Sequence, residues 1–220
     1  MKTTRTNSRT LFAVLISFSV VWLVGCATKA YDKSQAAARS LQIAGDEVQI
    51  ERRALESALN SLNDLVNKPQ PDLIAGYGGF SETVDQLEVA SRRSDAAASR
   101  VDRSGAAYFQ NWDKELAAMN FDAIREHSEA RKAEVANHFE QVKRRYAQAQ
   151  STMQPFIAYL KDIRKALGTD LTPAGLKAMK GATENANANG AKVQSALANL
   201  AAELSSSGAN MSSVAAQNRQ

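Results

Sequence analysis

The sequence predicts an all-α fold: an elongated antiparallel up-down bundle of about four long helices with coiled-coil-like seams, after an N-terminal signal helix. Apolar residues recur at alternating steps of three and four over most of the 220 residues, which is the period of helices packed along one face. Only 6% of the residues are aromatic, and no stretch alternates apolar with polar residues as a half-buried strand would. The apolar runs are separated by short breaks, which make sequential helices run antiparallel.

The first element is a predicted lipoprotein signal peptide, residues 1–25. Three basic residues precede an apolar run from Leu11 to Val24, and Gly25 and Cys26 follow, which is a layout typical of a secretory signal. The run has 14 residues, whereas a transmembrane helix needs about 20. An uncleaved anchor, or an ordinary signal with a coincidental cysteine, is the alternative; the small Gly25 directly before Cys26 favours cleavage between these two residues.

Cys26 is the only cysteine of the chain, and with Leu23, Val24 and Gly25 it resembles the cleavage motif of bacterial lipoprotein precursors. The resemblance implies that mature Cys26 carries a thioether-linked diacylglycerol and an acylated amine. A single acyl chain holds a protein on a bilayer only marginally, whereas two or more hold it stably. Ala27 stands where an aspartate would signal retention in the inner membrane, so the resemblance implies the periplasmic face of the outer membrane.

Cleavage also changes the charge balance. The chain has 27 basic and 23 acidic residues, and the leader contains three of the basic ones, which leaves 24 against 23. A nearly neutral mature domain lacks the basic surface that phosphate neutralisation requires, so we expect no nucleic-acid partner. A lipidated Cys26 leaves no free thiol, which excludes disulfides, thiolate nucleophiles and cysteine metal sites.

The first mature helix is predicted from a seven-residue apolar repeat. Its seam residues are Leu41, Val48, Leu55 and Leu62. We expect the helix to end at Lys68-Pro69, because proline lacks an amide hydrogen and disfavours the helical conformation in the residue before it. The next stretch, 70–79, contains Pro71, Gly76, Gly78 and Gly79 and predicts a connector.

The second helix has a seam whose middle consists of small residues. The seam residues are Phe80, Val84, Leu87, Ser91, Ser94, Ala98, Val101, Gly105, Tyr108 and Trp112. Small residues either let helices approach closely or leave room between them. A break is expected at 120–122, where Asp122 is predicted to cap the next helix.

The third helix keeps the three-four step across a proline. Its seam residues are Val135, Phe139, Val142, Tyr146, Ala149, Met153, Phe156, Leu160, Ile163 and Leu167. At Pro155 the helix either kinks, at a cost of about 3 kcal/mol, or a new helix begins. The unbroken register favours one kinked, continuous helix.

A stop and restart precede the last helix. Gly168 suits a left-handed C-terminal cap, Thr172 an N-cap, and Pro173 the first helical position. The seam residues that follow are Leu176, Met179, Thr183, Ala186, Gly190, Val193, Leu197, Leu200 and Leu204. The polar run 185–190 predicts local fraying or a close contact.

Serine, glycine, asparagine and glutamine dominate from Ser205 onward. Such a composition cannot bury enough apolar surface to order a chain. We therefore expect a disordered tail at 205–220 and a helical bundle domain at 26–204.

Several short motifs resemble a family of bacterial lipoproteins known only as domain of unknown function 2959. These motifs are Phe109-x-x-Trp112-x-x-Glu115-Leu116, Ile124-Arg125-Glu126-His127-Ser128, Arg145-Tyr146, Met153-x-Pro155, Tyr159-Leu160-Lys161 and the turn Asp170-Leu171-Thr172-Pro173. In the turn, Thr172 stands in the capping role that an asparagine has in the family. The resemblance implies a lipoprotein leader and a helical, coiled-coil-prone body, without an activity, a ligand or site residues.

No group of residues predicts catalysis, a cofactor or a metal site. His127 and His138 are 11 residues apart, which separates them by about 16 Å along a helix, so one ion cannot contact both. The glycine-rich stretch 76–79 lacks the preceding strand, the lysine and the hydroxyl of a phosphate-binding loop. Basic runs such as 143–145 favour a solvated surface over contact with anionic headgroups, because acidic residues are interspersed.

These observations favour a non-enzymatic envelope protein, tethered to the membrane through acyl chains on Cys26, that engages another envelope component or a second copy of itself. The alternative is a carrier, in which the small residues Ser91, Ser94, Ala98 and Gly105 leave room for a lipid tail or another apolar ligand. An enzyme is disfavoured because no nucleophile, base and orienting group converge in the sequence.

Overall fold

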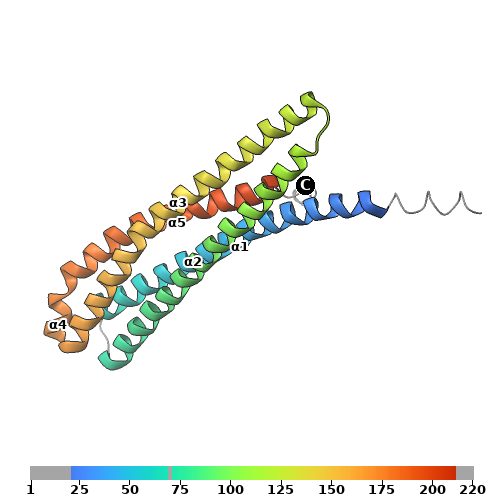
Figure 1. The fold of residues 1–220 in the computed structure, drawn as a ribbon. Helices are drawn as coiled ribbons and strands as arrows, with labels where there is room; N and C mark the ends of the chain where they lie inside the picture. Colours follow the sequence, from blue (N-terminus) through green and yellow to red (C-terminus); the bar gives the residue numbers. More distant parts are fainter. Residues whose placement is uncertain (1–20, 69–70, 212–220) are drawn as a thin grey trace, which may run out of the picture.

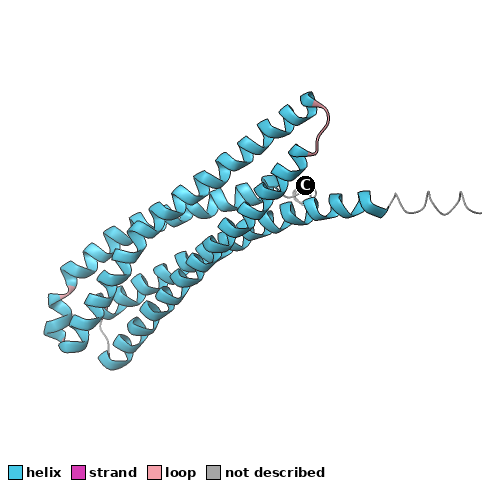
Figure 2. Cartoon of the chain, in the orientation of Figure 1, coloured by secondary structure: helices cyan, strands magenta, loops and turns pink. Residues whose placement is uncertain are grey.

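The computed structural model describes residues 21–68 and 71–211, and nearly all of them are helical (Figure 1). The helices are α1 (Val21–Asn67), α2 (Leu73–Ala117), α3 (Asp122–Thr169), α4 (Pro173–Ala178) and α5 (Lys180–Met211). No strand occurs within the described ranges (Figure 2). The predicted all-α fold class is confirmed.

The four long helices form an elongated up-down bundle, and α4 is a short helix between α3 and α5 (Figure 1). α1 packs against α2 and α5, and α3 packs against the same two helices. The connections α1–α2 and α3–α4 lie at one end of the bundle (Figure 1). The α2–α3 connection lies at the other end, where α1 begins.

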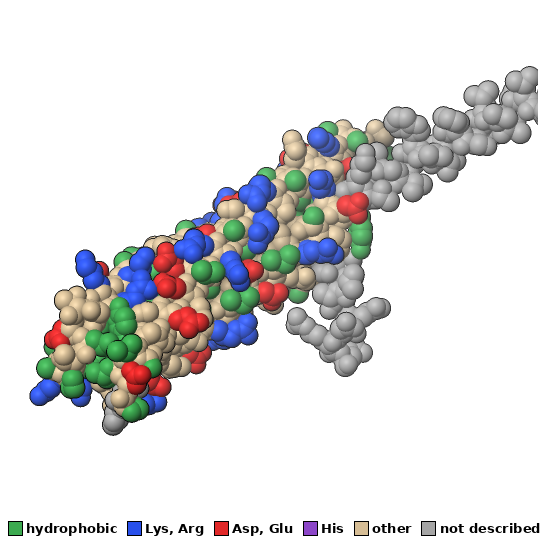
Figure 3. All heavy atoms as spheres, turned by 90° about the horizontal axis from the view of Figure 1, so that it is seen from below, with side chains coloured by type: hydrophobic (Ala, Val, Ile, Leu, Met, Phe, Trp, Pro, Cys, Tyr) green, Lys and Arg blue, Asp and Glu red, His purple; other side chains and the backbone are tan. Residues whose placement is uncertain are grey.

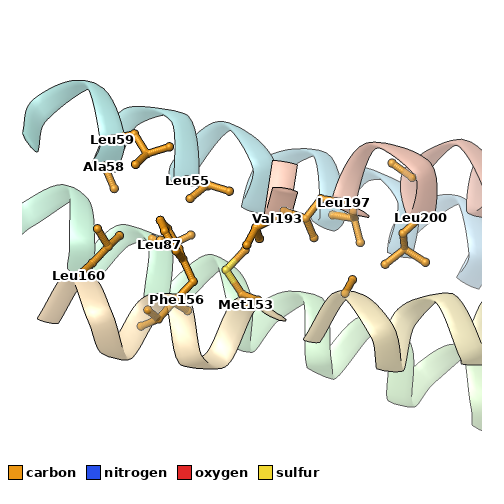
Figure 4. Close-up of a cluster of buried hydrophobic side chains, with 14 of the residues drawn as sticks. Leu55, Ala58, Leu59, Leu87, Met153, Phe156, Leu160, Val193, Leu197 and Leu200 are labelled. Carbon is orange, nitrogen blue, oxygen red and sulfur yellow. The ribbon is translucent and has the colours of Figure 1, made fainter. Parts of the chain in front are cut away.

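The predicted seams meet in one hydrophobic core. Leu55 and Leu59 of α1 and Leu87 of α2 face Met153, Phe156 and Leu160 of α3 and Val193, Leu197 and Leu200 of α5 (Figure 4). Burial of such side chains stabilises a fold by roughly 1.5–3 kcal/mol each. Because every long helix contributes to this core, the bundle packs as a unit.

On the face of the bundle shown in Figure 3, charged side chains of both signs are interspersed. In the basic run 143–145, Lys143 pairs with Glu140 at 3.3 Å and Arg145 with Glu203 at 3.5 Å. Exposed pairs of this kind contribute about 0.2–1 kcal/mol each. The arrangement matches the solvated surface that the sequence favours for this run.

The end of α1 agrees with the sequence, whereas the start of α2 does not. α1 ends at Asn67, within one residue of the predicted stop. The prediction of a connector over 70–79 is wrong, because α2 begins at Leu73. The carboxylate of Asp72 accepts hydrogen bonds from the amides of Ile74 at 2.9 Å and Ala75 at 3.1 Å. This cap satisfies amides that would otherwise lack partners and starts the helix ahead of its glycines.

The glycines of the bundle differ in what surrounds them. A Cβ atom at Gly78 would meet nothing within 4 Å, whereas at Gly105 it would lie 2.7 Å from the Phe139 ring. We expect Gly78→Ala to raise the free energy of unfolding by about 0.5–1 kcal/mol, because it reduces the entropy of the unfolded chain. Gly105→Ala is expected to lower it by about 1 kcal/mol through overpacking. Urea denaturation of both variants checks this, and shifts in the same direction would contradict it.

The break between α2 and α3 lies where the sequence predicts it, since α2 ends at Ala117 and α3 begins at Asp122. The prediction that Asp122 caps α3 is wrong. The N-cap is Phe121, whose side chain makes no capping hydrogen bond. Asp122 is the first helical residue, where its carboxylate accepts a hydrogen bond from Arg125 and lies at the positive end of the helix dipole.

α3 runs through Pro155 without a break, so the predicted single helix is confirmed and the split alternative is wrong. The left-handed cap predicted at Gly168 is also wrong, because no described glycine has a positive φ. A Cβ atom at position 168 would lie 2.6 Å from the Tyr77 hydroxyl. Glycine is therefore favoured here by the packing of Tyr77 rather than by a turn.

The restart after α3 follows the prediction. The hydroxyl of Thr172 accepts a hydrogen bond from the amide of Gly175 at 3.1 Å, and Pro173 is the first residue of α4. One difference is an interruption at Met179, which separates α4 from α5 where the sequence predicts one helix.

The polar run 185–190 forms a close contact and does not fray. Asn187 and Asn63 exchange side-chain hydrogen bonds at 2.8 Å. A Cβ atom at Gly190 would lie 2.6 Å from a methyl group of Leu59, so the close approach of α5 to α1 in this packing favours glycine.

The predicted boundary of the disordered tail is wrong for its first seven residues. α5 continues to Met211, and Ser207 and Gly208 are buried. The amphipathic helix outweighs the polar composition here because these small residues pack against α1, where Gly208 lies next to Ala38 and Gln42. The rest of the predicted tail, 212–220, lies outside the described residues.

Candidate functional site

The middle of the bundle contains a buried carboxyl group. Glu51 of α1 is 0% exposed. The side chains of Ser91, Ser94 and Gln150 lie close enough to act on its carboxyl group as hydrogen-bond donors, but within the described ranges none of them forms a hydrogen bond of regular geometry with its oxygens. The side chains of Ser91, Ser94 and Asp95 from α2 and of Tyr146 and Gln150 from α3 surround it. These six residues are called the Glu51 cluster below. A buried polar atom whose hydrogen bonding is incomplete costs about 1–3 kcal/mol, so Glu51 does not contribute to the stability of the fold.

The surroundings of Glu51 favour its neutral form. Burial raises the pKa of the Glu51 carboxyl above its ordinary value, and the nearby Asp95 carboxylate raises it further. The hydroxyls of Ser91 and Ser94 and the amide of Gln150 act in the opposite direction but do not cancel the effect of burial. A carboxyl group that is neutral in the core avoids the larger cost of an unpaired buried charge.

Tyr146 closes the other side of the cluster. Its hydroxyl donates a hydrogen bond to the Asp95 carboxylate. Burial and this hydrogen bond both raise the pKa of Tyr146, so the phenol keeps its proton. The cluster therefore holds a tyrosine and a carboxylic acid that favour their protonated forms, without a described histidine beside them.

A cavity of about 140 Å³ lies next to the cluster, between α1, α2, α3 and α5. Its lining residues are Ala44, Val48, Ser94, Ala98, Val101, Asp102, Val142, Lys143, Tyr146 and Leu204. Ser94 and Tyr146 belong both to the cavity and to the Glu51 cluster. Ser94 is 1% exposed, and its hydroxyl faces Glu51 and Tyr146 but forms no hydrogen bond of regular geometry in the described part of the chain. The cavity is thus mainly apolar, with one polar wall.

The small residues singled out in the sequence divide into two groups. Ser94 and Ala98 line the cavity. Ser91 is buried in the Glu51 cluster, where it accepts a hydrogen bond from Gln154 at 3.3 Å. Gly105 offers no free space, because the Phe139 ring fills the position of a side chain. The prediction that all four leave room between the helices is therefore correct only for Ser94 and Ala98.

The other candidate residues lie apart from this site. His127 is exposed and His138 is half-buried, and within the described ranges no three His, Cys, Asp or Glu residues are grouped to hold a metal ion. Trp112 is half-buried and donates a hydrogen bond to Ser128 at 2.9 Å. Gly76 lies inside α2, so it forms no phosphate-binding loop.

Sequence reasoning missed Glu51, although a signal was present. Glu51 follows Val48 by three residues and precedes Leu55 by four, so it occupies a seam position of α1. A charged residue at a core position is the pattern that marks a buried polar site. Tyr146, by contrast, was expected on the seam of the third helix, and it is half-buried there.

Gly25 and Cys26 lie near the start of α1. The leader up to residue 20 lies outside the described residues. Among the described helices, none combines the length and apolar character that crossing a membrane requires.

Comparison with known proteins identifies a family but no activity. A family profile described as "Protein of unknown function (DUF2959)" matches residues 27–214. No curated protein matches the chain significantly. The match covers the described helices from residue 27 onward, including the Glu51 cluster and the cavity. The chain therefore belongs to the DUF2959 family, a family of proteins of unknown function.

Proposed function

We propose that this protein is a lipoprotein of the bacterial cell envelope, held at the periplasmic face of the outer membrane by acyl chains on Cys26. The observation that supports this most strongly is the sequence Leu23-Val24-Gly25-Cys26 at the end of an apolar run too short to span a bilayer. Ala27 at the next position favours the outer membrane over the inner one. Once the leader is cleaved, α1 begins at the lipid attachment.

The bundle is proposed to act by binding rather than by catalysis. From Cys26 to the end of α1, a helix rises about 60 Å, so the anchored bundle reaches far from the membrane surface. Charged groups of both signs are interspersed on the face shown in Figure 3. In the Glu51 cluster the hydroxyls of Ser91 and Ser94 lie beside a carboxyl group whose neutral form is favoured, which makes that carboxyl a poor base. The proposed role is that of a structural or interaction module that contacts another envelope protein or a second copy of itself.

Crosslinking in intact cells, followed by affinity purification from envelopes, tests this role. The lipidated protein is compared with a Cys26→Ser variant at the same abundance. We expect crosslinked species from the lipidated protein, and any species lost in the variant depends on membrane attachment. Recovery of only uncrosslinked monomer from both proteins would contradict the proposal.

The cavity supports a second candidate function, that of a carrier for an apolar ligand. Its volume of about 140 Å³ is close to that of an engineered protein cavity of about 150 Å³ that binds benzene. Such a space holds a small apolar molecule or one segment of a lipid tail. The hydroxyl of Ser94 lies at the cavity wall, where a polar group of that ligand would meet it.

A substitution that fills the cavity tests the carrier function. Ala98 is half-buried at the cavity wall, and Ala98→Leu is expected to raise the free energy of unfolding by about 0.5–2 kcal/mol while abolishing ligand retention. Native mass spectrometry of protein lacking the Cys26 lipid measures retention. The carrier function would be excluded if the protein with alanine at position 98 retained no apolar molecule. It would also be excluded if the Ala98→Leu variant retained as much apolar ligand as that protein.

A further inference from the structure

The position of Cys26 along the bundle follows from hydrogen bonds between α1 and α2. The hydroxyls of Ser40 and Ser104 lie 2.6 Å apart, and those of Ser61 and Thr83 also lie 2.6 Å apart. In both pairs the residue numbers add to 144, as expected for two antiparallel helices of equal rise. The same register places Ala118, directly after α2, level with Cys26. Figure 1 agrees, since α1 begins at the end of the bundle that carries the α2–α3 connection.

Exposed apolar side chains gather at this level. The segment 118–124, called the α2–α3 tip below, contains Phe121, which is 72% exposed, and Ile124, which is 58% exposed. Tyr31, about one and a half turns after Cys26 on α1, is 52% exposed. Of the large apolar side chains in the described ranges that are more than half exposed, only Ile74, at 77%, lies at the opposite end.

Folding does not explain the phenylalanine at position 121. Phe121 is the N-cap of α3, a position where serine, threonine, aspartate and asparagine stabilise a helix by accepting an amide hydrogen bond. Its side chain makes no capping hydrogen bond and little contact with the bundle. The chain thus gives up a helix cap in order to present an aromatic ring to the surroundings.

From these observations we infer that the α2–α3 tip contacts the surface of the same bilayer that holds the acyl chains of Cys26. This inference rests on the proposed lipidation. Apolar and aromatic side chains at such a level partition into the headgroup region of a membrane. Two side chains are too few to hold the protein alone, so the anchor supplies the high local concentration that makes the contact effective. The bundle therefore meets the membrane at two points, which restricts its tilt.

The charge of the tip indicates the kind of lipid surface involved. The charged residues of the segment 118–126 are Asp122, Arg125 and Glu126, and Arg125 pairs with Asp122. No excess positive charge is present to attract anionic headgroups. The contact is accordingly apolar, and we expect it on a zwitterionic bilayer.

A fluorescent probe beside the tip tests the inference. Asn120→Cys introduces one thiol next to Phe121, and a lipidated Cys26 leaves it as the only free thiol of the protein. The labelled protein is placed in phosphatidylcholine vesicles containing nitroxide-labelled lipid. We expect strong lipid quenching at position 120 and little quenching for the matched control Ile74→Cys, at the far end of the bundle. Equal quenching at the two positions would overturn the inference.

A second arm separates this inference from the lipidation itself. A Cys26→Ser protein with a histidine tag at its N-terminus is held on vesicles that contain a nickel-chelating lipid. If intact mass shows no acyl chains on Cys26, the proposed function fails, but quenching at position 120 on this tagged protein still decides whether the tip contacts lipid. If the acyl chains are present and the probe remains unquenched, the inference alone fails.

Phe121→Asn distinguishes membrane contact from a structural role of the ring. Asparagine is a favourable N-cap, so the variant is expected to unfold at a higher temperature than the unsubstituted protein. We expect quenching of the probe at position 120 to fall to the level of the Ile74→Cys control. Loss of folding, or quenching as strong as before, would contradict a membrane role for Phe121.

Discussion

Glu51→Gln is expected to raise the free energy of unfolding by about 1–2 kcal/mol above neutral pH, because it removes the cost of keeping a buried carboxyl group either ionised or protonated at a pH above its ordinary pKa. Glutamine has nearly the same shape, and its amide can donate hydrogen bonds to the hydroxyls of Ser91 and Ser94. Those hydroxyls already face position 51. Urea denaturation measures the difference.

The gain from Glu51→Gln is expected to depend on pH. Burial raises the pKa of Glu51 in the folded protein above its ordinary value of 4.5. Between these two pKa values the folded state binds more protons than the unfolded state, so the stability of the unsubstituted protein falls as pH rises through that window. The Glu51→Gln variant lacks this titration. Its gain in free energy of unfolding over the unsubstituted protein should therefore be largest above the pKa of Glu51 in the folded protein and absent below pH 4.5.

Glu56→Gln is the matched control, because Glu56 is exposed on the same helix. Its effect is expected to stay within about 0.5 kcal/mol at every pH. A Glu51→Gln variant that is less stable than the unsubstituted protein at pH 8 would show that the ionised carboxylate has partners in the core, and it would contradict the description of the Glu51 cluster.

Leu87→Ala is expected to lower the free energy of unfolding by about 2–5 kcal/mol, the largest effect of the substitutions considered. Leu87 is 0% exposed and lies beside Phe156 and Leu160 at the centre of the core (Figure 4). The rigid packing of four helices leaves a cavity where the side chain is removed. Leu87→Met nearly conserves the volume and should cost less than about 1.5 kcal/mol. Equal losses in the two variants would contradict this account of the core.

Most of the fold can be predicted from the sequence, because one physical signal, the three-four apolar period, decides both helix formation and which face is buried. The seams through Leu55, Leu87, Phe156 and Leu197 lie in the core as expected. The errors fall where a local rule competes with tertiary contacts. Composition at 70–79 indicates a connector, but the cap at Asp72 starts a helix there.

Gly168 shows the same limit of sequence reasoning. Its chemistry suits a left-handed cap, whereas in the structure it makes room for a tyrosine from a distant helix. A glycine favoured by packing and a glycine favoured by a turn cannot be told apart in one sequence, because only the three-dimensional neighbours differ.

The candidate site is predictable only in part. The small seam residues Ser94 and Ala98 pointed to space between helices, and they line the cavity. That Gly105 leaves no space depends on where the Phe139 ring lies, which the helical period does not encode. The Glu51 cluster likewise depends on how three helices are aligned along the bundle. It forms only because seam positions on α1, α2 and α3 lie at the same level, and the sequence does not encode that alignment directly.

The mass of the mature protein purified from bacterial envelopes tests the central claim most directly. We predict a polypeptide that begins at Cys26 and carries a thioether-linked diacylglycerol and an acylated amine, recovered with the outer membrane. A Cys26→Ser protein should lack these groups and leave the membrane fraction. A native polypeptide that retains its leader, or that begins elsewhere and carries no acyl group, would contradict the proposal that this helical bundle works as a lipid-anchored envelope protein.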